Sequence, residues 1–200
     1  FQDNGWDVKK LMRLMLTSST FKQQSAAPPA AWQSDPGNVR LARGTRIRLD
    51  AEQIRDQALY VAGLLVERPG GPSVKPYQPE GLWQEVAMLQ SNTRVYQQGM
   101  GDELHRRSMY TFWKRAAPPA SMEIFNATAR EVSCLRRERA NTPLQALVTL
   151  NDPVYIEAAQ GLARRMLQQP GPLDAQLRFG FQTCLTRPPE PVELAALQQL

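Results

Sequence analysis

The chain has 200 residues, of which 42% are hydrophobic and 22% charged, and its formal net charge is +5 at pH 7. This composition is typical of a folded globular chain and excludes a disordered tail, a collagen-like fibre and a disulfide-dense scaffold. One histidine and two cysteines exclude a His/Cys metal cage and a Cys-x-x-Cys motif, and no stretch of eighteen apolar residues could cross a bilayer.

The first third of the chain shows mainly helical spacing of apolar residues. An apolar i, i+3, i+4, i+7 pattern from Val8 to Met15 predicts a helix that fades near residue 20, and the proline-containing segment 23–38 predicts a loop. Asp50 is expected to cap a second helix, with Gln53 completing a capping box. The apolar stripe expected to face inward on this helix consists of Ala51, Ile54, Ala58, Val61 and Leu65.

Periodicity is lost over about residues 68–101, which are rich in proline and glycine, and only 81–89 could hold a short helix. A loop of this length inside a domain is commonly functional. Residues 104–116 regain helical spacing, although 109–113 could equally form a short strand. A short helix is expected over 121–126.

The last third contains four helix-start signals, at Thr142, Asp152, Asp174 and Pro191. The apolar turn 146–148 predicts a buried first helix. Three inward stripes are expected on the following helices: Ile156, Ala159, Ala163 and Met166; Leu177, Phe181, Cys184 and Leu185; Leu194, Leu197 and Leu200.

The expected fold is therefore mainly α. We expect one helical domain over 1–200, with N-terminal helices in 1–66, an irregular loop over 67–101 and C-terminal helices in 102–200. Because residue 1 is Phe rather than Met, we expect the chain to be a fragment or a processed product.

The net positive charge is concentrated between residues 104 and 139, which hold eight basic and three acidic residues. Arginine outnumbers lysine 19 to 5 in the chain, and its planar guanidinium suits carboxylates, sulfates and phosphates. Two interpretations stay open here. The arginines could form an anion-facing surface, or they could tie loops to backbone carbonyls and nearby acids.

The candidate ligand-binding residues are cations and aromatic residues in three segments. If residues 104–116 are helical, Arg107, Thr111 and Lys114 share one face. The alternatives are that the aromatic residues pin the loop to the core and that the basic face is merely solvated. The full candidate set is Lys75, Tyr77, Trp83, Arg94, Tyr96, Arg106, Arg107, Tyr110, Lys114, Arg115, Arg136, Arg137 and Arg139.

Three remaining residues have ambiguous roles. His105 has only Asp102 and Glu103 beside it, which fits a surface residue better than a catalytic base. Cys134 and Cys184 could pair or could each be a small buried residue. We expect no metal site, and no catalytic residue can be assigned.

Three motifs in order resemble one known family: residues 71–83 (GPSVKPYQPEGLW), 106–115 (RRSMYTFWKR) and 139–147 (RANTPLQAL). This succession is similar to the C-terminal domain of unknown function in large exported proteins of planctomycetes and their relatives. The resemblance implies a periplasmic or cell-envelope setting and a cytochrome-c-like haem module elsewhere in the parent chain, with no cofactor in this part. It implies no reaction.

The leading interpretation is a non-catalytic accessory or binding module that recognises an anionic or saccharide ligand, such as an anionic polysaccharide, or docks to other domains of its parent protein. One alternative is part of a composite active site in a haem-linked or polysaccharide-active enzyme. Another is a purely structural scaffold. Nucleic-acid binding and a membrane span are not expected.

Overall fold

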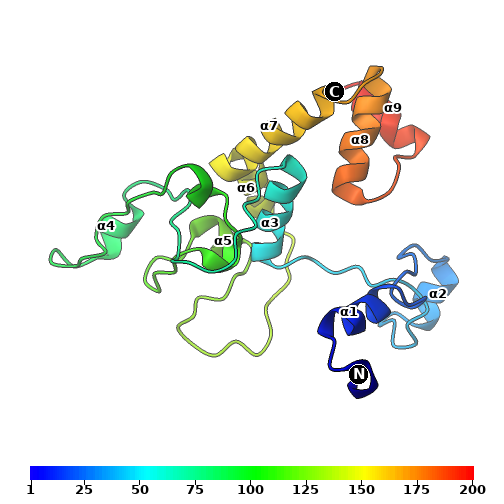
Figure 1. The fold of residues 1–200 in the computed structure, drawn as a ribbon, viewed down its shortest axis with the longest axis horizontal. Coiled ribbons are helices and arrows are strands. Elements are labelled where there is room, and N and C mark those ends of the chain that lie inside the picture. The colour runs from blue at the N-terminus through cyan, green and yellow to red at the C-terminus, as the bar shows by residue number, and fades with distance from the viewer. The chain divides into compact units, whose positions relative to one another are not determined.

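The computed structural model describes residues 1–200 (Figure 1). Its regular secondary structure consists of helices, with only isolated β-bridges between other segments. The mainly α fold class is thereby confirmed. The residues group into two compact units, Phe1–Arg48 and Leu49–Leu200. One helical domain over 1–200 stays a prediction. None of the helices is both long enough and apolar enough to cross a bilayer.

The first unit contains a 3-10 turn, η1 (Gln2–Asn4), and two helices, α1 (Val8–Leu16) and α2 (Pro29–Ser34). The expectation of a loop throughout 23–38 is wrong at α2, because a proline at the first helical position is compatible with a helix start. The Arg43 guanidinium organises this region. It donates to the carbonyl oxygens of Asp35 and Pro36 and lies 3.9 Å from the centre of the Trp32 ring.

The second unit is built on α3 (Ala51–Ala62) and α7 (Pro153–Leu167), which lie against each other in Figure 1. Gly161 of α7 permits this packing, because a Cβ there would lie 3.0 Å from the backbone oxygen of Ala62. The capping box at Asp50 and Gln53 is confirmed. The buried core cluster consists of Ala51, Leu59, Met122, Phe125, Val154 and Tyr155.

The predicted helices outside residues 104–116 are present, but several bury a different face from the one expected. The α3 stripe in the structure is Ala51, Arg55, Leu59 and Ala62. The α7 stripe is Val154, Tyr155, Ala158 and Gly161. The α3 stripe contains Arg55, and hydrophobic periodicity does not place a charged residue in the core. The stripe expected on α3 is correct in part, because Ala51 is buried and Ile54, Ala58 and Leu65 pack against the core cluster. The stripe expected on α7 is wrong, because Ile156, Ala159 and Ala163 are exposed.

Residues 104–116 do not form the expected helix. Residues 101–116 form two 3-10 turns, η2 (Gly101–Leu104) and η3 (Ser108–Tyr110), separated by extended backbone. The extended parts make isolated parallel bridges between Val66 and Arg106 and between Val74 and Thr111. Long-range backbone pairing has therefore replaced helical hydrogen bonds in this segment. The short helices α4 (Leu82–Val86) and α5 (Ala120–Ile124) lie where short helices were predicted.

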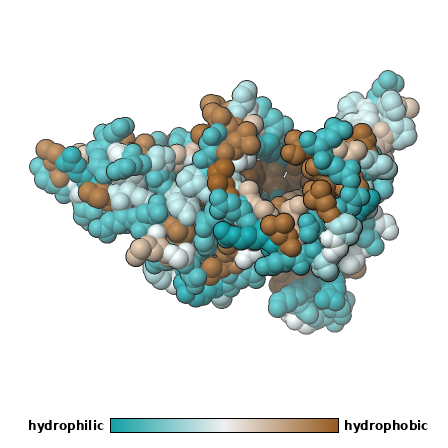
Figure 2. All heavy atoms as spheres, turned by 90° about the horizontal axis from the view of Figure 1, so that it is seen from above, coloured by the Kyte–Doolittle hydropathy of each residue, from teal (hydrophilic) through white to brown (hydrophobic).

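The C-terminal helices α6 (Pro143–Asn151), α7, α8 (Leu173–Leu185) and α9 (Pro191–Gln198) begin at or within two residues of the predicted signals. The expected burial of α6 is wrong, because Leu147 is 56% exposed. Gln145 is the buried residue of α6, and its amide donates to the carbonyl oxygen of Ile124. On the face shown in Figure 2, apolar side chains are interspersed among polar ones. In α8 the buried residue is Gly180, and Leu185 is exposed.

Candidate functional site

Arg106 is a structural residue rather than part of an open cationic face. Its side chain is almost fully buried, with only 1% of the residue exposed. The guanidinium donates to the carbonyl oxygens of Pro72, Arg68 and Gly70 at 3.1, 2.8 and 2.5 Å. The Tyr110 ring covers it at 3.8 Å. The interpretation that arginines tie loops to backbone carbonyls therefore holds for this residue.

The cationic helix face expected from Arg107, Thr111 and Lys114 does not exist, because the segment is not helical. Thr111 is buried, and the Lys114 ammonium donates to the carbonyl oxygen of Thr93 at 2.8 Å. Arg107 alone stays at the surface, with its Nε 3.6 Å from a carboxylate oxygen of Asp56. Arg115 is also exposed, at the start of the turn that leads to α5.

The aromatic residues of the 67–101 loop mostly fasten it in place. Trp83 is 2% exposed and packs against Tyr96 and Phe112 at ring-centre distances of 4.8 and 5.6 Å. Lys75 lies 5.6 Å from the Trp83 ring centre. The Tyr96 hydroxyl donates to the carbonyl oxygen of Pro76, and burial raises the pKa of Tyr96. Arg94, in the same loop, is half-buried.

The second arginine cluster lies apart, on the loop between α5 and α6. Arg137 forms a two-point ion pair with Glu52, with N–O distances of 2.6 and 3.0 Å. Arg136 and Arg139 are exposed, and a hollow of about 430 Å³ is lined by residues 136–140 alone. The cations are therefore not gathered around one cavity with Trp83. The amide of residue 143, at the start of α6, cannot help to bind an anion because that residue is proline.

Two predicted residues, Arg107 and Tyr110, do share an open cavity with side chains of α3. We call this cavity the α3 cleft, and its volume is about 610 Å³. One wall is the polar face of α3, and the other consists of residues 65–69 and the η3 turn. The cleft is lined by Gln53, Asp56, Gln57, Tyr60, Leu65, Glu67, Arg68, Pro69, Arg107 and Tyr110.

The α3 cleft combines an exposed ring with several hydrogen-bonding groups. Tyr60 is 63% exposed, so its ring face is open to a flat or ring-shaped ligand. The Gln53 amide nitrogen and the Gln57 amide oxygen can pair with a ligand, whereas Gln53 Oε1 already accepts from the Asp50 backbone and Gln57 Nε2 donates to the Cys184 carbonyl at 3.4 Å. Asp56 is already engaged, since one of its oxygens accepts from the Ser108 backbone at 2.7 Å. The lining includes no serine, cysteine or histidine, and its carboxylates are those of Asp56 and Glu67.

His105 has a partner that its sequence neighbours did not indicate. Its Nε2 lies 2.9 Å from Oε2 of Glu157 on α7, and the Tyr77 hydroxyl donates to the same oxygen at 3.0 Å. The three side chains join the η2 segment, the 67–101 loop and α7. These hydrogen bonds link the loops to the core and lie outside the α3 cleft. Groups of three His, Cys, Asp or Glu residues that could hold a metal ion are absent from the structure.

The hydrogen bonds of Glu157 should make the free energy of unfolding depend on pH in the acidic range. Burial raises the pKa of Glu157, but the hydrogen bonds from His105 and Tyr77 outweigh burial, so the net pKa is below the usual value. A carboxyl group with a lower pKa in the folded state contributes stability above its unfolded-state pKa and loses it as the pH falls. We expect Glu157→Gln to be less stable than the parent at pH 6, and the difference to shrink toward pH 3.

Chemical denaturation of both proteins between pH 6 and pH 3 measures this effect. Glu123→Gln is the matched control, since Glu123 is exposed on α5, and its effect should not change with pH over this range. A pH-independent difference between Glu157→Gln and the parent would show that the charge of Glu157 does not contribute.

The model of the family "Protein of unknown function (DUF1553)", PSD1, matches residues 1–200. The chain belongs to the DUF1553 family. No curated protein and no solved structure matches it in the comparisons. The family assignment supports the resemblance to a domain of unknown function and carries no activity with it.

The cleft residues of this DUF1553 chain that the sequence analysis missed are mainly on α3. Gln53, Gln57 and Tyr60 follow a spacing of four and three residues, which places them on one helix face. A polar stripe with an aromatic residue, opposite an apolar stripe, was the available signal. An apolar stripe gives the buried face of a helix and does not by itself mark the polar face as a binding surface.

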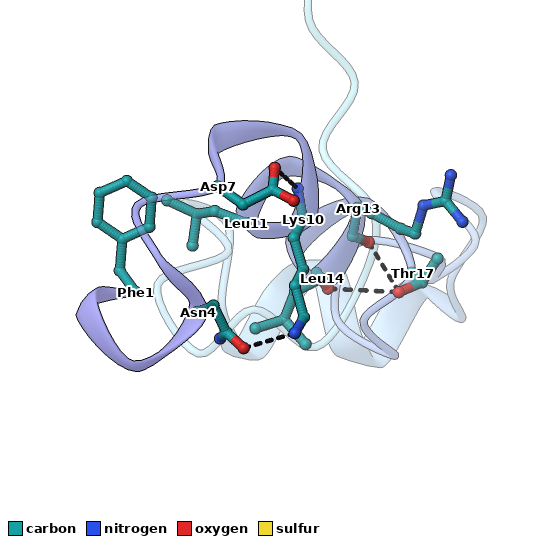
Figure 3. Close-up of a pocket in the computed structure, with 8 residues that line it drawn as sticks. All are labelled: Phe1, Asn4, Asp7, Lys10, Leu11, Arg13, Leu14 and Thr17. Atoms are coloured by element: carbon teal, nitrogen blue, oxygen red, sulfur yellow. Dashed lines mark hydrogen bonds between the residues drawn. The ribbon is translucent and has the colours of Figure 1, made fainter.

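A second hollow of the DUF1553 chain, about 360 Å³ in volume, lies in the first unit along α1 (Figure 3). Its polar side chains are largely engaged with one another or with the helix. Asp7 accepts from the Lys10 backbone at 3.0 Å, and the Thr17 hydroxyl donates to the Arg13 carbonyl at 2.8 Å. Because the α3 cleft offers more free polar groups beside an open ring, we place the candidate site there.

Proposed function

We propose that this DUF1553 chain is a non-catalytic accessory module that binds a saccharide in the α3 cleft. The observation that carries the proposal is the convergence of the exposed Tyr60 ring with Gln53, Gln57 and Arg107 on one open cavity. A sugar ring presents an apolar face that stacks on an aromatic ring, and hydroxyls that pair with amides, carboxylates and guanidinium groups.

The setting that goes with this proposal is an exported, cell-envelope protein with a c-type haem module in another part of the parent chain. It is supported by the resemblance of residues 71–83, 106–115 and 139–147 to domains of such proteins. In this setting the module would hold a polysaccharide or envelope glycan near its partner domains.

A structural scaffold is the second candidate, and the burial of Arg106 and Trp83 favours it. Both residues were candidates for ligand contact, and both serve the packing of the loop instead. The two functions differ in one measurable respect. A scaffold has no saccharide affinity to lose when an exposed cleft residue is replaced.

Calorimetric or NMR titration of the whole chain with a panel of soluble oligosaccharides tests the proposal. We expect Tyr60→Ala to weaken binding about tenfold, which corresponds to about 1.4 kcal/mol and is typical of a lost aromatic contact. Trp6→Ala is the matched control, because Trp6 is equally exposed but lies outside the cleft. No binding by the parent chain, or equal binding by Tyr60→Ala, would favour the scaffold.

A further inference from the structure

The positively charged Arg106 is buried behind the wall of the α3 cleft and has no carboxylate partner. The buried Arg106 guanidinium donates only to carbonyl oxygens and forms no ion pair, and its Nε has no hydrogen-bond partner. Carbonyl dipoles satisfy its donors but do not cancel its net charge. The guanidinium is covered by Tyr110 and holds the carbonyl of Arg68, and both of these residues line the cleft.

The charged side chains that line the cleft sum to zero, so the sign of the net charge around the cleft depends on the buried groups behind them. Arg68 and Arg107 line it together with two carboxylates, Asp56 and Glu67. Behind them lie two buried guanidinium groups, those of Arg55 and Arg106.

The charge of one further carboxylate, that of Asp152, acts on Arg55. The balance of these groups is therefore one positive charge. A charge in a poorly solvated wall acts more strongly on a ligand than one in water does.

The two carboxylates of the cleft are not equally available to repel an anion. Asp56 accepts from the Ser108 backbone and lies 3.8 and 3.6 Å from the nitrogens of Arg55 and Arg107, so its charge is largely compensated. Glu67 is exposed and makes no hydrogen bond or ion pair. Arg107 approaches Asp56 most closely through its Nε, and its two terminal nitrogens make no hydrogen bond, so they can form a fork on an oxyanion.

We infer that the α3 cleft selects an acidic saccharide, a sugar bearing a carboxylate or sulfate group, over a neutral one. The inference rests on the proposed function. The sugar ring stacks on Tyr60, and its oxyanion binds the Arg107 fork beside Arg68, with the buried charge of Arg106 behind them. Glu67 opposes the anion from the rim and limits the affinity.

Titration of the whole chain with three trisaccharides of similar size tests the selectivity: a galacturonate trimer, a sulfated galactose trimer and a neutral galactose trimer. We expect at least one acidic trimer to bind about tenfold more tightly than the neutral one at low salt, and the difference to narrow in 0.5 M salt. The comparison between the two acidic trimers identifies the oxyanion.

Three variants separate local recognition from the overall positive charge of the chain. Arg107→Gln should weaken binding of the acidic trimer about tenfold and change neutral binding little. Glu67→Gln should strengthen acidic binding about threefold. The control Arg178→Gln removes the same charge from an exposed position on α8, outside the cleft, and should change nothing.

Each outcome is informative. Equal affinity for the neutral and acidic trimers would overturn the inference and leave the proposed saccharide function standing. A loss in Arg178→Gln equal to that in Arg107→Gln, or an unchanged acidic affinity in Glu67→Gln, would also overturn it. Failure of all three trimers to bind would remove the proposed function as well.

Discussion

Arg106→Met is expected to lower the free energy of unfolding by about 3 kcal/mol and to release the turn at residues 68–72. Methionine fills much of the same volume but donates no hydrogen bonds, so three backbone carbonyls lose a charged donor. Hydrogen bonds to charged groups are among the strongest in proteins, although water regains access to part of this turn. The expected loss is therefore smaller than the sum of three such bonds.

Urea unfolding measures the global effect, and amide hydrogen exchange at Gly70 measures the local one. The Gly70 amide donates to the Tyr110 hydroxyl at 2.7 Å, so its protection reports whether the turn stays closed. Arg115→Met is the matched control at an exposed position, with an expected change within about 0.5 kcal/mol. Equal stability and equal Gly70 protection in Arg106→Met and the parent would contradict the structural role given to Arg106.

The second large effect is expected at Leu59, whose replacement by alanine should cost about 3 kcal/mol. Leu59 is 0% exposed and lies in the core cluster, where α3 meets α7. Removing its side chain leaves a cavity that the packed helices can only partly close.

Leu147→Ala provides the control for the same chemical change, because Leu147 on α6 is 56% exposed. We expect it to change the free energy of unfolding by no more than about 0.5 kcal/mol. The denaturant midpoints of the two variants are compared with that of the parent. Similar losses in both variants would mean that α6 is covered in solution or that α3 is not the centre of the core.

The starts of helices were predictable because the signals that set them are local. Asp50, Thr142 and Asp152 each provide a side-chain acceptor for backbone amides within the next three residues. Those contacts depend on the nearby sequence alone. The capping boxes and the prolines at helix starts therefore lie in the structure where the sequence predicted them.

The buried faces were less predictable because they depend on partners that are distant in the chain. Arg55 is buried on α3 because it donates to the carbonyl oxygens of Leu104 and Arg106, about fifty residues away. The same cause explains the failed helix over 104–116, whose backbone pairs with residues 66 and 74 instead. Apolar periodicity contains no information about such partners.

The candidate site was predictable in part for the same reason. Arg107 and Tyr110 were identified by residue type, and both line the α3 cleft. Arg106 and Trp83 have the same residue types, but the fold uses them internally. Residue type identifies basic and aromatic residues as candidates for ligand binding, whereas their burial in the fold determines which of them a ligand can reach.

Tyr110 has a consequence for how the cleft would respond to occupancy. The residue stacks on Arg106, accepts a hydrogen bond from the Gly70 amide and lines the α3 cleft. Opening of the 68–72 turn and emptying of the cleft are therefore coupled equilibria, and a ligand bound in the cleft would slow exchange of the Gly70 amide, although Gly70 does not line the cleft.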